Sequence, residues 1–361
     1  MNASTSQAGP APPRRIPVAV LGATGAVGQA FVRLLAGHPW LELAAVAASE
    51  QSAGRRYGDA VRWREPTPLP DAAADLLVQP CVAPLDAAIV FSALDAAIAR
   101  EVEPAFARAG ALVVTNASAW RMDPLVPLLI AEVNADHLRL LDAQRREHGW
   151  PGGIVANPNC STAALVLALA PLHRGFGLER LFVVTMQAVS GAGYPGVASL
   201  DILGNVIPYI AEEEEKVERE TRKLLGTLDG GGVRGAEVVL SVHTNRVPVE
   251  DGHTESVSAG FSRRVAPEEA VRALEAFRAC GVVATLPSTP ERPLEVDRRP
   301  DRPQPARDRD KGGGMTVTVG RIRPCPILDL RLTLMGHNRI RGAAGGAIQL
   351  GELLVAEGIA R

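Results

Sequence analysis

The sequence predicts an α/β protein in which a Rossmann-type, doubly wound parallel sheet is followed by an α+β domain with a mixed sheet. Its 361 residues are too many for one ordinary hydrophobic core, so two domains are expected. A strand, a glycine-rich loop, a helix and a second strand follow one another within about thirty residues near the N-terminus. After residue 157, long strands separated by irregular segments replace this alternation.

The first domain is expected over residues 17–157. Its elements are expected as strands at 17–21, 43–47, 88–91, 112–115 and 153–156, a glycine loop at 22–28, and helices at 29–35 and 95–108. Residues 1–16 are rich in Ala, Pro and Ser and lack the apolar run of a signal peptide, so a disordered tail is expected there.

The second domain is expected over residues 158–337. Its strands are expected at 181–188, 238–243, 256–261, 315–322 and 328–334, with helices at 212–225 and 267–279. Residues 287–314 carry many Pro and Arg residues and little apolar periodicity, which indicates a long loop or arm. The last segment, 338–361, reads as a helix of small residues that packs back on the first domain.

Composition limits the function classes. Hydrophobic residues make up 47% and charged residues 22%, a mix typical of a soluble globular protein. The net charge of −2 provides no electrostatic basis for binding nucleic acid or an anionic membrane. The longest apolar run, 163–172, is too short to span a bilayer. The four cysteines have no metal-ligand spacing and read as reduced thiols, so no metal and a cytoplasmic location are expected.

Cys160 is the first candidate for chemistry. It lies in NPNCST (157–162), where a strand ends and a hydrophobic helix is expected to begin just after the cysteine, with Ser161 or Thr162 as its cap. Unpaired N–H groups and the positive end of the helix dipole favour a thiolate, hence a nucleophile. A small buried cysteine that merely packs is an equally good interpretation of this hexapeptide.

The loop GATGAVG (22–28) predicts a nucleotide site. Glycines without side chains let backbone N–H groups approach a pyrophosphate at a helix start, although tight β–α turns also use glycine structurally. Ser49 and the nearby Arg55 and Arg56 suit a 2′-phosphate, whereas Glu50 favours the ribose hydroxyl of NAD. The balance favours NADP.

The other candidate residues, each taken alone, give weaker signals than Cys160 or the glycine loop. His253 follows a glycine in a turn, with Arg246 before it. A near-neutral histidine can exchange protons with a thiol and an arginine can hold a carboxylate, but His253 also reads as a surface residue. The acidic run 212–215 reads as a solvated helix start, or as a ligand site formed by Glu213 and Lys216. Arg121 follows a strand end, where anions bind in such sheets.

Together these segments resemble the aspartate-β-semialdehyde dehydrogenase family, specifically its archaeal/fungal-type branch. The matching pieces, in the family's order, are GATGAVG, TNASAWRMD, NPNCST, QAVSGAGYPG, EEEEKVERET, NRVPVEDGHTESV, DRDKGGGMTVTVGRIR and GHNRIRGAAGG. The resemblance covers nearly the whole chain. It implies reversible NADPH-dependent reductive dephosphorylation of L-aspartyl-4-phosphate to L-aspartate-4-semialdehyde through a cysteine thioester, in a homodimer or homotetramer.

The resemblance also assigns roles. Cys160 is implied as the nucleophile, His253 as the acid–base residue and Gln187 as the residue that orients the acyl group. Arg246 and Glu213 are implied to bind the substrate, and Lys216, Arg121 and Asn116 its phosphate. The implied cofactor residues are Thr24, Gly25, Ala26, Val27, Ser49, Ser92, Ser190, Gly191 and Asn338.

Three rival functions are considered. N-acetyl-glutamyl-phosphate reductase is the more distant, because it normally has a different residue pattern beside its cysteine. Archaeal malonyl-CoA reductase resembles this branch and uses the same cysteine and histidine, but Glu213, Lys216 and Arg246 favour an amino-acid acyl phosphate over a coenzyme A thioester. A nucleotide-sensing protein without catalysis would need neither Cys160 nor His253.

Overall fold

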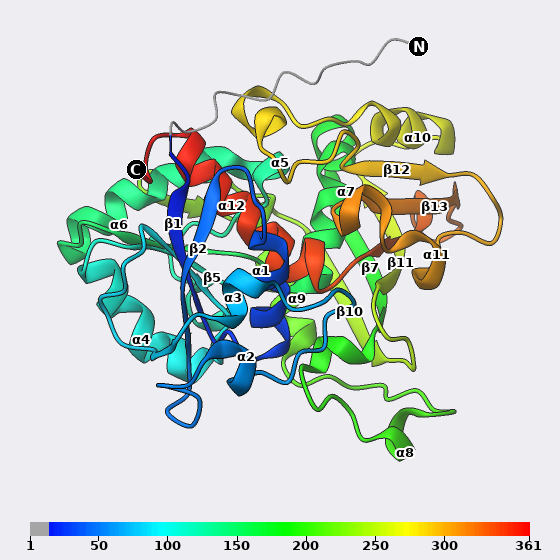
Figure 1. The fold of residues 1–361 in the computed structure, drawn as a ribbon. Helices are drawn as coiled ribbons and strands as arrows, with labels where there is room; N and C mark the ends of the chain where they lie inside the picture. The colour runs from blue at the N-terminus through cyan, green and yellow to red at the C-terminus, as the bar shows by residue number, and fades with distance from the viewer. Residues whose placement is uncertain (1–13) are drawn as a thin grey trace, which may run out of the picture.

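The computed structural model describes residues 14–361, and residues 1–13 of the expected tail lie outside this range. Two six-stranded sheets stand side by side, one in the N-terminal half of the chain and one in the C-terminal half (Figure 1). The expected pair of a doubly wound parallel sheet and a mixed sheet is confirmed. The predicted domain boundaries themselves stay a prediction.

The first sheet has the order β3-β2-β1-β4-β5-β6, and all of its strands run parallel. Its strands are β1 (Ile16–Leu21), β2 (Leu41–Ala48), β3 (Val78–Pro80), β4 (Ile89–Ser92), β5 (Leu112–Thr115) and β6 (Gly153–Ala156). The strand order reverses between β1 and β4, which is where ligands bind in open α/β sheets. The short strand β3 was not expected.

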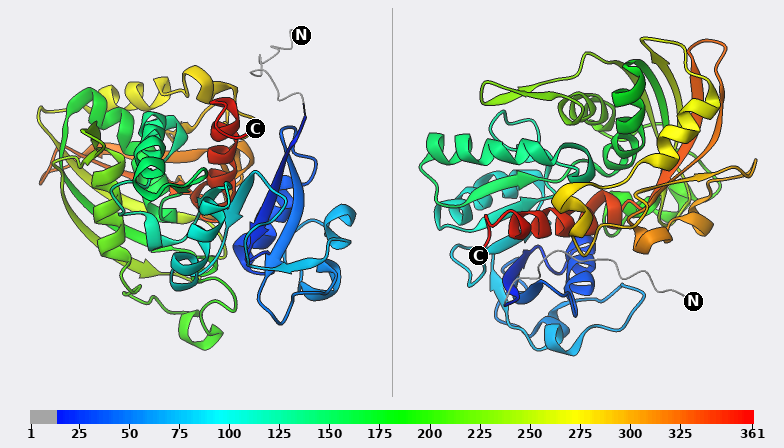
Figure 2. Two further views of the ribbon diagram at one scale, coloured as in Figure 1. Left: turned by 90° about the vertical axis from the view of Figure 1, so that its left-hand side faces the viewer. Right: turned by 90° about the horizontal axis from the view of Figure 1, so that it is seen from above.

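Helices cover both faces of this sheet (Figure 2). The helices that pack on it are α1 (Ala26–Leu35), α4 (Ala96–Arg108), α6 (Leu140–His148) and α12 (Gly345–Ala356). The short helices α2 (Tyr57–Ala60), α3 (Asp71–Ala74) and α5 (Ala131–Asn134) lie in the connections. The C-terminal α12, red in the figures, packs against β4 and β5. At Gly351 an added Cβ would lie 2.6 Å from the Phe91 ring, so this helix approaches the sheet closely.

The second sheet has the order β10-β7-β11-β14-β13-β12 and is mixed: β10 with β7 and β12 with β13 are parallel pairs, and the others are antiparallel. Its strands are β7 (Leu178–Gln187), β10 (Val239–Arg246), β11 (His253–Phe261), β12 (Leu294–Asp297), β13 (Val317–Pro324) and β14 (Leu330–Gly336). A small hairpin, β8 (Thr227–Asp229) and β9 (Gly232–Arg234), stands apart.

The helices of the second half are α7 (Cys160–Phe176), α8 (Ser199–Ile202), α9 (Glu213–Leu224), α10 (Pro267–Ala276) and α11 (Pro305–Asp308). Of these, α7 packs on β11 and β14, α9 on β10, and α10 on β12 and β13. Short turns complete the chain: 3₁₀ turns at Ser118–Trp120, Ala135–Arg139, Val189–Ala192, Gly281–Thr285 and Lys311–Gly314, and a π-turn at Ile340–Ala344. Within residues 14–361 no helix is both long and apolar enough to cross a bilayer.

The expectation of a plain loop or arm at 287–314 is wrong. This segment contains β12, which extends the second sheet beside β13, and the short helix α11. Leu294 is buried, and an ion pair between Arg302 and Asp308 closes the bend that follows. The strand is too short, and too closely flanked by Pro and Arg, for its periodicity to stand out.

Candidate active site

Two cavities open at the C-terminal edge of the first sheet and share one wall. The larger, about 980 Å³, follows the glycine loop and the end of β2, and the smaller, about 430 Å³, surrounds Cys160. Both are lined by Val27, Ala93, Leu94, Asp95, Ala192 and Gly193, so the two form one continuous site. We call them the nucleotide cleft and the cysteine cavity.

The glycine loop forms the floor of the nucleotide cleft. Thr24, Gly25, Ala26 and Val27 all line it, and α1 begins at Ala26. A Cβ at Gly28 would lie 2.1 Å from the Gly22 carbonyl oxygen, so only glycine permits this tight turn. The glycine loop leaves backbone N–H groups at the start of α1 free to approach a phosphate, and the loop therefore fits a dinucleotide.

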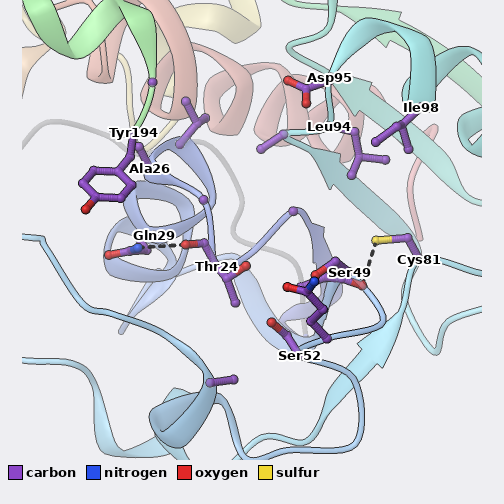
Figure 3. Close-up of a pocket in the computed structure, with 18 of the residues that line it drawn as sticks. Thr24, Ala26, Gln29, Ser49, Ser52, Cys81, Leu94, Asp95, Ile98 and Tyr194 are labelled. Carbon is purple, nitrogen blue, oxygen red and sulfur yellow. Dashed lines mark hydrogen bonds between the residues drawn. The ribbon is translucent and has the colours of Figure 1, made fainter. Parts of the chain in front are cut away.

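The far end of the cleft is lined by Ser49 and Ser52, which lie on one side of Thr24, with Tyr194 on the other (Figure 3). The structure does not bring Arg55 and Arg56, which were expected to suit a 2′-phosphate, to the wall of the cleft. Arg56 pairs with Asp75 at 3.0 Å, Arg55 donates to the carbonyl of Asp59, and neither lines the cleft.

The arginines that line the cleft are Arg62 and Arg64. Arg64 stacks on the ring of Tyr194, at 3.0 Å from its centroid, and so ties the loop after β7 to the rim of the cleft. Ser92 behaves differently from the other expected cofactor residues: its side chain is fully buried and lines neither cavity.

Cys160 is the first residue of α7, whereas the helix was expected to begin just after it. The cap is Asn159 and not Ser161 or Thr162. The Asn159 side-chain oxygen accepts hydrogen bonds from the N–H groups of Ser161 at 2.9 Å and Thr162 at 3.2 Å. Because this cap uses two of the free N–H groups at the helix start, fewer of them stabilise a thiolate.

Cys160 and His253 form a close pair, with Sγ and Nε2 3.2 Å apart. His253 is the first residue of β11 and is fully buried, so it is not a surface turn residue. Burial raises the pKa of the Cys160 thiol to about 12, and Glu213 adds to this rise. Burial, followed by the charge of Arg246, lowers the pKa of His253 to about 3.

Both pKa shifts differ from the sequence-based expectations, which were a lowered pKa for the cysteine and a near-neutral pKa for the histidine. Loss of water around the pair is the largest cause of both shifts.

Gln187, Arg246 and His253 come from three adjacent strands and lie behind Cys160. Gln187 and Arg246 are direct partners across β7 and β10, and β11 pairs with β7 on its other side. All three are buried, and none lines the cysteine cavity. Arg246 Nη1 donates to the Ala188 carbonyl at 2.8 Å. The loop residue Gly191 closes over them, since a Cβ there would lie 2.7 Å from Arg246 Nη1.

Within the acidic run the structure distinguishes Glu213 from its neighbours. Glu213 is buried, lines the cysteine cavity, and accepts hydrogen bonds from Asn159 Nδ2 at 2.8 Å and Gln187 Nε2 at 3.0 Å. The side chain of Glu212 is 78% exposed, and Glu214 accepts from the Thr244 N–H. The helix start is therefore only partly solvated.

The expected phosphate residues Asn116, Arg121 and Lys216 all line the cysteine cavity. Arg121 pairs with Glu220 at 3.0 Å, and Lys216 lies 3.2 Å from the Glu212 carboxylate. Glu220 also accepts from the Asn159 N–H at 2.7 Å, so it fixes the segment before Cys160.

Ser190, Gly191 and Asn338 line the cysteine cavity and not the nucleotide cleft. Asn338 accepts from the Gly252 N–H and donates to Ser190 Oγ, both at 2.8 Å, and so joins the turn before His253 to the loop after β7.

Sequence reasoning missed several residues. Glu220 follows Glu213 by two helical turns and shares its face of α9, a spacing that would have indicated it. Gly342, from the π-turn, lies where a Cβ would come within 2.6 Å of the Cys160 Cβ, and no sequence signal shows this. Among residues 14–361 no three His, Cys, Asp or Glu side chains are arranged to hold a metal ion.

Comparison with known proteins agrees with this geometry. The family model described as semialdehyde dehydrogenase, NAD binding domain, matches residues 17–141, and the one described as semialdehyde dehydrogenase, dimerisation domain, matches 169–341. The aspartate-semialdehyde dehydrogenase of Archaeoglobus fulgidus is 51% identical over 96% of this chain and 99% of its own length. That of Candida albicans is 42% identical over 94% of this chain and 98% of its own.

Solved structures give the same result. The aspartate semialdehyde dehydrogenase of Candida albicans with NADP superposes with a TM-score of 0.88 at 40% identity, covering 95% of this chain and 99% of that one. Aspartate semialdehyde dehydrogenase II of Vibrio cholerae, complexed with ASA, gives a TM-score of 0.74 at 29% identity over 95% and 98%. The chain therefore belongs to the semialdehyde dehydrogenase family, together with the aspartate-semialdehyde dehydrogenases of archaea and fungi.

Proposed function

We propose that this protein catalyses the reversible, NADPH-dependent reductive dephosphorylation of L-aspartyl-4-phosphate to L-aspartate-4-semialdehyde, as its relatives' names imply. The observation that carries the proposal is the Cys160–His253 pair, 3.2 Å apart, beside a cavity continuous with the nucleotide cleft. A cysteine that forms a thioester needs such a neighbour and such access. The reaction belongs to biosynthesis of the aspartate-family amino acids lysine (through diaminopimelate), threonine and methionine.

For the substrate, we assign Cys160 as the nucleophile and His253 as its acid–base partner. Gln187, which donates a hydrogen bond to Glu213, is assigned to orient the acyl group. Glu213 is buried and lines the cavity, and we assign it to bind the substrate's amino group. We assign Arg246 to the substrate's α-carboxylate, although in this structure Gly191 stands between its guanidinium and the cysteine cavity. For the phosphate, we assign the residues that line the cavity beside Cys160, namely Lys216, Arg121 and Asn116.

For the cofactor, we assign Thr24, Gly25, Ala26 and Val27 to the pyrophosphate end and Ser49 to the adenosine end of the cleft. Ser190, Gly191 and Asn338 line the cysteine cavity, which suits them to the nicotinamide end. Ser92 is left out because its side chain lines neither cavity. NADP(H), when bound, supplies hydride chemistry to the acyl group on Cys160.

We also propose that the protein is a cytoplasmic homodimer or homotetramer. The match to a dimerisation domain includes the segment around α8, which extends away from the body of the molecule (Figure 1). Leu200 there is 91% exposed, and Leu203, Val206 and Tyr209 are also exposed, so this segment offers apolar side chains that a second copy would cover. Light scattering after size exclusion tests this, and a monomer would contradict it.

One assay tests the function. NADP reduction is followed with aspartate semialdehyde and phosphate, in parallel with malonyl-CoA-dependent oxidation of NADPH. We expect turnover only in the first reaction, and none without phosphate. Malonyl-CoA turnover would favour a coenzyme A thioester reductase, and NADPH binding without either reaction would favour a nucleotide-binding protein.

A further inference from the structure

Lys223, near the end of α9, is a buried cation without a role in the proposed reaction. Only 7% of it is exposed, and its ammonium donates to the backbone carbonyls of Arg121 at 2.8 Å, Asp123 at 2.6 Å and Val126 at 2.9 Å. An ammonium has three N–H donors, so all three are used. One side chain therefore closes the whole turn formed by residues 121–126.

The 121–126 turn carries Arg121, which we assign to the substrate's phosphate. The same helix also holds the Arg121 side chain, because Glu220 accepts a hydrogen bond from its Nη1 at 3.0 Å. Glu220 thus fixes the guanidinium, and Lys223 fixes the backbone beneath it. Without Lys223, three carbonyl oxygens that converge on one point would repel one another and lose their donor.

The helix α9 presents these groups on one face. Glu213, Lys216, Glu220 and Lys223 follow one another at steps of three, four and three residues, which keeps them on one side of a helix. The first two line the cysteine cavity, whereas the last two line neither it nor the nucleotide cleft. The start of α9 therefore borders the ligand, and its end supports Arg121.

We propose that Lys223 is a positioning residue for the substrate's phosphate: its ammonium keeps the 121–126 turn closed, and the turn holds the Arg121 guanidinium at the cysteine cavity. This inference rests on the proposed function and refines its phosphate site. Lys223 acts through Arg121, because the carbonyl of Arg121 itself is one of its three acceptors. Loss of the ammonium opens the turn and lowers the affinity for phosphate.

The charge of Lys223 changes within a pH range that is convenient for assays. Burial lowers its pKa from 10.5 to about 8, although the charges of Asp123 and Glu220 oppose this shift. A neutral amine has two N–H donors and one lone pair, so one of the three carbonyls then loses its donor. Binding of phosphate should therefore weaken as the pH rises through about 8.

Other charged or titratable groups surround Lys223 and were considered as sources of the same effect. They are Asp123 and Glu220, Arg121, Arg219 and Arg222, and His137. Burial lowers the pKa of His137, so this imidazole carries no charge above pH 7. Phosphate itself gains negative charge as the pH rises, which would strengthen its binding to cations. A weakening at alkaline pH must therefore come from the protein.

The first test measures phosphate binding and needs no turnover. Inorganic phosphate is titrated into the NADP-loaded protein by calorimetry at pH 7 and pH 9, with the wild type, K223M and K223R. We expect the wild-type Kd to rise about tenfold between the two pH values, and K223M to bind about tenfold more weakly already at pH 7. K223R should show no rise, because a guanidinium stays charged.

Three results of this titration would overturn the proposal. They are a wild-type Kd that is equal at both pH values, a rise that persists in K223R, and no binding of phosphate by the wild type at either pH. If K223M does not fold, the wild type and K223R still decide the question.

The second test separates positioning from a general loss of structure. K223M should raise the KM for phosphate about tenfold at pH 7 and leave the affinity for NADP unchanged, because Lys223 does not line the nucleotide cleft. R222M is the matched control, since Arg222 is the preceding residue of α9 and donates to the Val238 carbonyl at 3.0 Å instead of to the 121–126 turn. An equal KM for phosphate in K223M and the wild type, or an equal rise in both variants, would contradict the proposal.

Failure of the proposed function is distinguishable from failure of this inference. If the wild-type protein binds phosphate but turns over no aspartate semialdehyde, the substrate assignment is wrong, whereas the calorimetric comparison of wild type and K223R still decides the role of Lys223.

Discussion

The nucleotide cleft and the cysteine cavity adjoin each other but are built in different ways. Most of the cleft comes from segments that follow strands of a single sheet, and its key contacts are glycines and backbone groups. The cysteine cavity draws on residues separated by more than 300 positions, from Val27 to Ala343, and buries acidic and basic side chains together. A local motif specifies the first, and only the complete fold specifies the second.

This difference explains which properties follow from local sequence. The glycine loop does what its sequence indicates because its neighbours in the chain are its neighbours in space. Around Cys160 the local signal, a helix start, predicts a low pKa, but distant segments remove water and raise it. The pKa values of side chains in such a cavity depend on burial, and burial depends on segments that are distant in the sequence.

The largest expected effect is a loss of turnover from a change in the cysteine cavity that leaves NADPH binding in the cleft intact. Cys160→Ala should reduce turnover by at least about 10⁴-fold, because no other group can carry the acyl intermediate. NADPH affinity should change little, since Cys160 does not line the cleft. Steady-state kinetics and a fluorescence titration with NADPH measure both. Substantial residual turnover would remove Cys160 from its role.

A second change acts on the cleft. Gly28→Ala should weaken NADPH binding by roughly tenfold or more, because its Cβ would lie 2.1 Å from the Gly22 carbonyl oxygen and the loop must shift. Gly175→Ala, in α7, is the matched control, because nothing lies within 4 Å of its added Cβ. Equal NADPH affinity in both variants would show that the tight turn is not required for binding.

A third, smaller effect distinguishes the two arginine pairs. The double variant R62A/R64A should raise the KM for NADPH by roughly tenfold and leave the KM for NADH nearly unchanged, because a 2′-phosphate loses its cations. The matched variant R55A/R56A should change neither. If the second variant, and not the first, affects NADPH, the cleft-lining arginines have been wrongly assigned.

The smallest effect concerns stability where α4 packs on the first sheet. Glu103 is fully buried on α4, and burial raises its pKa from 4.5 to about 7. A raised carboxyl pKa means that the folded state holds its proton more tightly than the unfolded chain. The stability that Glu103 contributes is therefore fully present below about pH 4.5 and is lost as the pH rises through about 7.

The side chain in Glu103→Gln is neutral at every pH, so the variant should show a weaker dependence of Tm on pH than the wild type. The expected change is a few degrees, roughly what a pKa shift of this size gives in a chain of this length. Thermal unfolding at pH 5 and pH 8 measures it. An unchanged difference in Tm between the two pH values would contradict the assignment, and turnover should stay near that of the wild type.

Much of the first sheet follows from sequence because its strands are short apolar runs ended by turns, as at Leu112–Thr115 and Gly153–Ala156. The strand β12 escapes prediction because only its pairing with β13 makes its four residues a strand. In the site, the cysteine and the glycine loop carry local signals. Gly342 does not, because its importance lies in a contact with Cys160 made across the fold.

The acyl-enzyme gives the most direct test of the central claim. The holoenzyme is mixed with aspartate semialdehyde and NADP without phosphate, so that a thioester cannot be discharged by phosphorolysis, and the intact protein and its peptides are weighed by mass spectrometry. We predict one aspartyl adduct, confined to the peptide that contains Cys160 and absent from Cys160→Ala. No adduct, or an adduct on Cys81, Cys280 or Cys325, would contradict the account.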